Sequence, residues 1–145
     1  ELVEEAALLL RPRLKHKRVE LSKQFHEQPV VKVDKQQILQ VLINLLSNAA
    51  DAVPEQGKIS VGTGTGWMNS DKNQPCAIIE VTDNGPGIPS AHLPRLFDPF
   101  FTTKHDGTGL GLSISQKIVR DHGGVIRVST AEGKGTTFQV SLPLS

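Results

Sequence analysis

The chain has 145 residues, a length that suits one domain with a single core. It is 37% hydrophobic and 21% charged with a net charge of +1, so charge alone points to neither a nucleic acid nor a membrane. The only cysteine, Cys76, excludes an internal disulfide and a cysteine-rich metal site. The acidic start "ELVEEAALLL" excludes a signal peptide, and no apolar run approaches the ~20 residues that cross a bilayer.

The first half of the chain predicts two helices and three strands. Residues 1–17 have the pattern of an amphipathic helix, in which Pro12 marks a kink or an end. "VELSKQF" and "PVVKVD" are typical of short strands. Asp34 is a candidate N-cap for a long helix over about 35–53. "KISVGTGTG" predicts a strand that runs into a flexible turn, and "MNSDKNQP" a hairpin tip.

The second half alternates glycine-rich loops with regular elements. "CAIIEVTD" predicts a buried strand, "NGPGIP" a loop and "SAHLPRLF" a short irregular helix. "LGLSISQKIVRDH" predicts a helix that Gly123 and Gly124 end, and "VIRVST" and "TTFQVSLP" predict a hairpin. Without regular βαβ alternation, this order indicates an α+β fold: a two-layer α/β sandwich with a mixed, mostly antiparallel sheet of about five strands and about three helices on one face.

Polar side chains form a stripe along the predicted helix 35–53. At 100° per residue, Asn44, Asn48 and Asp51 lie within about 60° of one another. The opposite side carries the apolar residues Ile38, Leu42, Leu45 and Ala49. Asparagine is a poor helix former, which favours a chemical role, and its amide oxygen suits Mg²⁺; a plain solvent-facing side explains the stripe equally well.

Two loops carry the other candidate chemistry. Asp83 ends a strand and is followed by two glycines and a proline rather than by a helix, so its carboxylate is available to an amino group such as that of a purine. The glycines 107, 109 and 111 precede a helix N-terminus, where free N–H groups favour a phosphate. The spacing is not that of a P-loop, and a Rossmann fingerprint would need a strand directly before the loop, which "FFTTKHD" does not predict. A glycine-rich loop alone is weak evidence.

Five motifs occur in a fixed order: "NLLSNAADA" (44–52), "DNGPGI" (83–88), "LFDPFFTTK" (96–104), "GTGLGL" (107–112) and "GKGTTF" (133–138). Together they resemble the ATP-binding catalytic domain of sensor histidine kinases, in the subgroup around nitrogen-regulatory kinases. DNA gyrase, Hsp90 and MutL belong to the same wider group. The resemblance covers essentially the whole chain and implies the Bergerat fold, with residues 97–107 in a mobile lid over the nucleotide.

The resemblance assigns roles to individual residues. It implies ATP and Mg²⁺ as cofactors, with Asn48 as the metal ligand and Asp83 as the acceptor of the adenine amine. The expected catalytic residues are Asn44, Asn48 and Lys104. Lys104 is expected to be a lid cation near the phosphates. The remaining predicted nucleotide contacts are Gly85, Gly87, Ile88, Gly107, Thr108, Gly109, Leu110, Gly111, Leu112 and Thr136.

One position separates the members of this group. In the relatives that hydrolyse ATP with water, the family pattern places a general-base glutamate one turn before the metal-binding asparagine; here that residue is Asn44. A neutral amide cannot take a proton from water. A kinase is therefore the favoured interpretation, and a water-using ATPase and a non-catalytic nucleotide-sensing module are the alternatives.

The resemblance also implies partners that this chain does not contain. None of the five histidines has the context of a phospho-acceptor, so we expect that residue on a dimerisation domain before Glu1. Residues 1–17 are then a helical lead-in and 18–145 the catalytic domain, cut from a longer protein. The expected partners are that histidine domain and a response-regulator receiver domain, in a homodimeric parent, with no nucleic acid and no membrane contact by this chain. The expected location is cytoplasmic, although parents in this family are commonly anchored in the inner membrane.

Overall fold

The computed structural model describes residues 2–26, 29–68, 71–99 and 111–144. Its elements are, in chain order, α1 (Leu2–His16), β1 (Glu20–Phe25), α2 (Lys35–Ala52), β2 (Lys58–Trp67), β3 (Pro75–Asp83), the 3-10 helix η1 (Ser90–Arg95), α3 (Gly111–Asp121), β4 (Val125–Thr130) and β5 (Thr136–Pro143).

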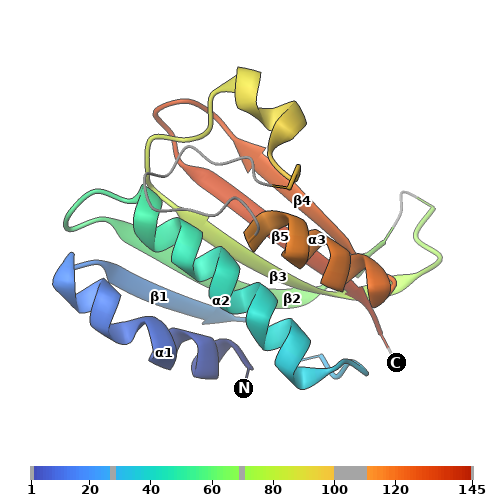
Figure 1. The fold of residues 1–145 in the computed structure, drawn as a ribbon. Helices are drawn as coiled ribbons and strands as arrows, with labels where there is room; N and C mark the ends of the chain where they lie inside the picture. The colour runs from blue at the N-terminus through green and yellow to red at the C-terminus, as the bar shows by residue number, and fades with distance from the viewer. Residues whose placement is uncertain (1, 27–28, 69–70, 100–110, 145) are drawn as a thin grey trace.

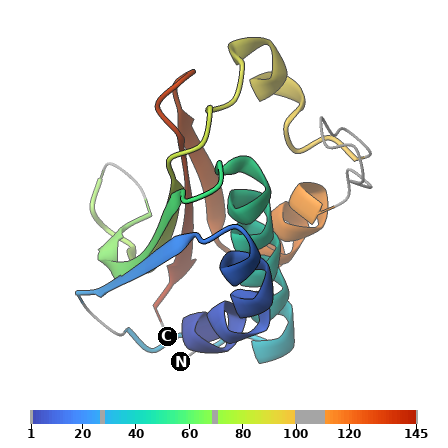
Figure 2. The same ribbon diagram turned by 90° about the vertical axis from the view of Figure 1, so that its left-hand side faces the viewer.

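The five strands form one sheet in the order β1-β2-β3-β5-β4 (Figure 1). The β1–β2 pair is parallel and the other three pairs are antiparallel. The helices α1, α2 and α3 all cover the same face of this sheet (Figure 2). The predicted α+β two-layer sandwich is confirmed.

The core lies between the helices and the covered face of the sheet. The predicted apolar side of α2 is buried there, at Ile38, Leu42, Leu45 and Ala49. The apolar side of α1 joins the same core through Val3, Ala6, Leu10 and Leu14. Burying one of the larger apolar side chains stabilises the fold by about 1.5–3 kcal/mol. Apolar contact is therefore the main interaction that holds α1 to α2.

Two sequence expectations for individual elements are wrong. Residues 29–34 form no strand; Val31 and Val33 are half-buried against the core, so packing rather than strand pairing explains their alternation. The β2 strand does not end in a turn at its glycines but continues to Trp67. Gly66 makes room there, because a Cβ at that position would lie 2.5 Å from Cδ1 of Ile78 on β3.

The sequence predicts a kink or an end at Pro12, and the structure excludes the end, because Pro12 lies inside α1. Proline removes the hydrogen bond to the carbonyl four residues earlier, here that of Leu8. The Leu8 and Leu9 side chains are 64% and 60% exposed, so this side of the helix faces water, which can hydrogen-bond the released carbonyl.

A histidine that follows the end of α3 contacts the residue that caps the start of α2. The Asp34 carboxylate caps α2 by accepting from the Gln37 N–H at 3.1 Å, and the Asp34 N–H donates to Nε2 of His122 at 3.1 Å. Nδ1 of His122 lies 2.8 Å from the Ile118 carbonyl, which can only accept. In this arrangement Nε2 accepts and Nδ1 donates, so both ring nitrogens are engaged. The predicted glycine stop follows, with Gly123 at φ +76°.

We predict that His122→Ala lowers the free energy of unfolding by about 1 kcal/mol, because two backbone groups lose a partner that water replaces only in part. Chemical denaturation followed by circular dichroism measures the loss. His16→Ala, at an exposed position of α1, is the control and should unfold as the wild type does. Equal stability of the two variants would contradict the proposed bridge.

Candidate functional site

The Asp83 carboxylate is buried at the end of a central strand. Asp83 pairs with Thr136 across β3 and β5, and each residue is only 6% exposed. The Gly85 N–H donates to Oδ1 of Asp83 at 2.9 Å. Burial raises the pKa of this carboxyl, and the N–H groups of Gly85 and Thr136 offset part of that increase. A buried carboxylate held by two backbone donors retains capacity to accept a further hydrogen bond.

The loop after Asp83 is pressed between two other segments. A Cβ on Gly85 would lie 2.7 Å from the carbonyl oxygen of Ala52, at the end of α2. Gly87 has φ +80°, and a Cβ there would lie 2.2 Å from the carbonyl oxygen of Ala131. These contacts are with the protein's own backbone, so the two glycines are required for the packing of the loop itself.

Thr130 is a site residue that the sequence analysis missed. Its hydroxyl accepts from the Ile88 N–H at 2.9 Å, donates to the Gly135 carbonyl at 3.0 Å and lies 2.9 Å from the hydroxyl of Thr136. It therefore ties the 84–89 loop to the β4–β5 hairpin. The only signal in the sequence was a second threonine on the other side of the turn "AEGKG".

The polar stripe of α2 faces the start of α3 at Asn44. The amide nitrogen of Asn44 donates to the Gly111 carbonyl at 3.1 Å and to the Ser115 hydroxyl at 3.0 Å. Its amide oxygen accepts from Gln40 at 3.2 Å. Asn48 lies one turn further along the same helix and is half-buried. The structure thus brings Asn44 and the first residue of α3 together.

The predicted phosphate loop is described only at its end. Gly111 begins α3, and the half-buried Leu112 packs against the core. Lys104, Gly107, Thr108, Gly109 and Leu110 lie outside the described residues, as does most of the expected lid. Their roles stay predictions.

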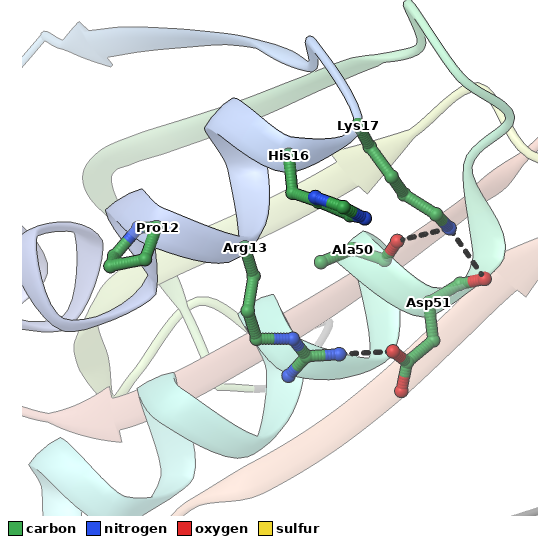
Figure 3. Close-up of a pocket in the computed structure, with 6 residues that line it drawn as sticks. All are labelled: Pro12, Arg13, His16, Lys17, Ala50 and Asp51. Carbon is green, nitrogen blue, oxygen red and sulfur yellow. Dashed lines mark hydrogen bonds and ion pairs between the residues drawn. The ribbon is translucent and has the colours of Figure 1, made fainter.

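Asp51 has a cationic partner that the sequence did not indicate. One guanidinium nitrogen of Arg13 pairs with the Asp51 carboxylate, and the other donates to the Ser47 hydroxyl at 2.6 Å. Figure 3 shows this pair at a pocket of about 310 Å³ between α1 and the end of α2. Because Arg13 and Asp51 are 38 positions apart, only the packing of the two helices reveals the contact.

Comparison with known proteins decides the family. Residues 33–145 match the family model described as "Histidine kinase-, DNA gyrase B-, and HSP90-like ATPase". The chain belongs to this family. Within it, the chain is an ATP-binding catalytic domain of the sensor histidine kinase type. None of the helices in the described part of the chain is long and apolar enough to cross a membrane.

The relatives support this placement. AtoS of Escherichia coli (strain K12), a signal transduction histidine-protein kinase, is 41% identical over 99% of this chain. NtrB of Rhizobium leguminosarum bv. phaseoli, a sensory histidine kinase/phosphatase, is 42% identical over 81% of it, which confirms the expected nitrogen-regulatory likeness. The chain spans only 23% of AtoS and 33% of NtrB.

Solved structures of histidine kinases have the same fold over the whole length of this chain. The catalytic domain of the histidine kinase ThkA has a TM-score of 0.85 and 35% identity, covering 99% of this chain and 91% of that one. ThkA in complex with the response regulator TrrA has a TM-score of 0.80 and 32% identity, covering 100% of this chain and 40% of that one. The α1 helix is therefore included in a match to an isolated catalytic domain.

We predict that Asp83→Asn makes the ATP-binding domain more stable without nucleotide but weakens ATP binding at least about tenfold, since a hydrogen bond to a charged group contributes about 1.5–3 kcal/mol. An asparagine oxygen still accepts from Gly85 but carries no charge to bury. As pH rises from the ordinary aspartate pKa of 3.8 through the raised folded value, the unfolded chain ionises first. The wild type should therefore lose stability relative to the variant over that range.

Thermal melting of both proteins as a function of pH, together with calorimetric titration of ATP, measures these effects. A variant that melts below the wild type at neutral pH would contradict the cost assigned to the buried charge. Unchanged ATP affinity would contradict the role of Asp83 as a ligand-binding group.

We predict that Asn44→Asp lowers the free energy of unfolding by about 1–3 kcal/mol, because the carboxylate cannot donate to the Gly111 carbonyl and repels it. Ser115→Ala removes only one of the two acceptors and should cost less. Urea denaturation ranks the two variants. The reverse order, or wild-type stability of Asn44→Asp, would show that this contact does not hold α3 to α2.

Proposed function

We propose that this domain binds Mg·ATP and presents the γ-phosphate to a histidine on a separate dimerisation domain of the same kinase. The imidazole nitrogen attacks phosphorus in line while the bond to ADP breaks, and the phosphoryl group then passes to an aspartate of a response regulator. The observation that carries the proposal is the buried Asp83 carboxylate beside Thr136, at the position to which the family resemblance assigns the adenine amine.

Adenine recognition follows from the acceptor chemistry of this carboxylate. An exocyclic amine donates to the oxygen of Asp83, whereas guanine presents a carbonyl at the corresponding ring position. A buried acceptor left without a donor costs enough to reject the wrong base strongly. The N–H groups of Gly85 and Thr136 hold the carboxylate, and Gly87 and Ile88 are proposed to contact the nucleotide from the loop that follows.

The donor set on α2 fits a magnesium ion that is held mainly by phosphates and water. Within the described residues no three His, Cys, Asp or Glu side chains cluster as metal ligands. Mg²⁺ often keeps several waters and takes only one or two protein oxygens, which the Asn48 amide can supply. When bound, the ion neutralises charge on the phosphates, and we propose that Asn48 fixes its place relative to α3.

Phosphate binding is proposed for the glycines 107–111 and the first turn of α3. The N-terminal end of an eleven-residue helix favours an anion, and Asn44 holds that end beside α2. Lys104 would add a positive charge. Catalysis would then consist of positioning and electrostatic stabilisation.

The contacts of Asn44 favour transfer to a histidine over transfer to water. Its nitrogen donates to Gly111 and Ser115 and its oxygen accepts from Gln40, so no basic group occupies this place. A response regulator as the further partner is supported by the ThkA–TrrA complex. A homodimeric parent with this domain in the cytoplasm, where ATP is present, completes the proposal.

Titration calorimetry and phosphorylation assays test the proposal together. The isolated chain should bind Mg·ATP without labelling itself or turning ATP over, and Asn48→Ala should abolish the Mg²⁺ dependence of binding. Added in trans to its own histidine-bearing domain, the wild type should transfer the γ-phosphate. Steady ATP hydrolysis by the isolated chain would favour a water-using ATPase, and binding without any transfer would favour a nucleotide-sensing module.

A further inference from the structure

Two cations at the end of α1 hold the last turn of α2. The Lys17 ammonium donates to the carbonyl of Ala50 at 2.9 Å, to that of Val53 at 3.0 Å and, more weakly, to that of Asp51 at 3.4 Å. Arg13 binds the Asp51 carboxylate and the Ser47 hydroxyl one turn earlier. Figure 3 shows both side chains reaching from α1 to the same end of α2.

Lys17 supplies a positive charge that the last turn of α2 lacks. The final carbonyls of a helix have no partner within it, and cations near them are favourable. The last turn of α2 contains no basic residue of its own. The Lys17 contacts to Ala50 and Val53 are partly buried, whereas the side chains in the Arg13–Asp51 pair are 46% and 36% exposed. Lys17 is therefore the stronger of the two anchors.

The same turn of α2 supports the nucleotide site from its other side. The Ala52 carbonyl lies against Gly85, so a shift of this turn displaces the loop that follows Asp83. Asn48 lies one turn before Ala52 on the same helix. The loop has little freedom to compensate, because the Asn84 side chain accepts from the Lys58 N–H at 2.8 Å and the Asn84 N–H donates to the Lys58 carbonyl at 3.1 Å.

Backbone hydrogen bonds also join the end of α1 to the end of α2. The Gln56 N–H, just after α2, donates to the Lys17 carbonyl at 2.8 Å, and the Glu20 N–H donates to the Gly57 carbonyl at 3.0 Å. The turn that leaves α1 and the turn that leaves α2 are thus fastened together. A displacement of the end of α1 is transmitted to the end of α2.

We infer that Lys17, assisted by Arg13, is a positioning residue for nucleotide binding: it sets the last turn of α2 and thereby the places of Asn48 and Gly85. The inference rests on the nucleotide site proposed above. It makes the affinity for Mg·ATP depend on how α1 sits against α2, without any contact between α1 and the nucleotide.

The test compares Mg·ATP affinity with stability in five variants. Lys17→Met keeps the aliphatic stem and removes the ammonium, and it should raise the Kd roughly fivefold or more, the lower end of typical coupling between sites. Lys17→Arg keeps the charge and should restore most of the affinity. Lys15→Met, exposed on the same helix, and Ile38→Val, buried at the opposite end of α2, should bind as the wild type does.

Calorimetric titration well below the melting temperature measures the Kd, and thermal melting measures stability. Arg13→Gln, at an exposed position that does not endanger folding, gives a second value, with an expected Kd increase of about threefold. If Lys17→Met and Arg13→Gln bind Mg·ATP like the wild type while melting earlier, their role is purely structural and the inference is overturned. If the wild type itself gives no heat with Mg·ATP, the proposed site fails first.

Discussion

The burial of the Asp83 carboxylate is the constraint around which the site is built. A charge in a place from which water is excluded is unfavourable, as its raised pKa reflects, and it persists only because backbone N–H groups point at it. To bring those groups close, three chain segments approach nearly to contact. A Cβ on Gly135 would lie 2.0 Å from the Asp83 carbonyl, and Gly85 and Gly87 face similar neighbours. The glycines and the buried acid therefore form one structural unit.

The sheet order places this unit where two layers meet. Because β3 and β5 are neighbours in the sheet, Asp83 and Thr136 lie side by side although they are far apart in the sequence. The end of α2 lies against the loop at Gly85, and Thr130 fixes the far side of that loop through Ile88. The site thus combines the ends of a helix, two strands and a hairpin. A change in any one of them alters the environment of the carboxylate.

Local signals predicted the elements well, and long-range contacts escaped prediction. The Asp34 cap and the Gly123 stop act within a few residues, so the sequence displays them directly. The predictions for residues 29–34 and for the glycines of β2 were wrong because the conformation of these segments depends on neighbouring strands and core residues. The order of the motifs identified the family, and the structure pairs Asp83 with Thr136, two residues that the motifs had placed in one predicted site. The sequence near Lys17, Arg13 and Thr130 did not indicate their hydrogen-bond partners, because each has a partner that is distant in the chain.

Asn44 shows how one substitution has two physical consequences. By resemblance, the water-using relatives carry a glutamate here, and an amide removes that base. The structure adds that the amide nitrogen is a donor to Gly111 and Ser115, so the residue also fixes the start of α3. Replacing Asn44 by glutamate would therefore not by itself create a hydrolase, because a carboxylate cannot donate to the Gly111 carbonyl and the contact that fixes the start of α3 would be lost. The residue that the resemblance places at the general-base position is thus also the residue that fixes the start of α3.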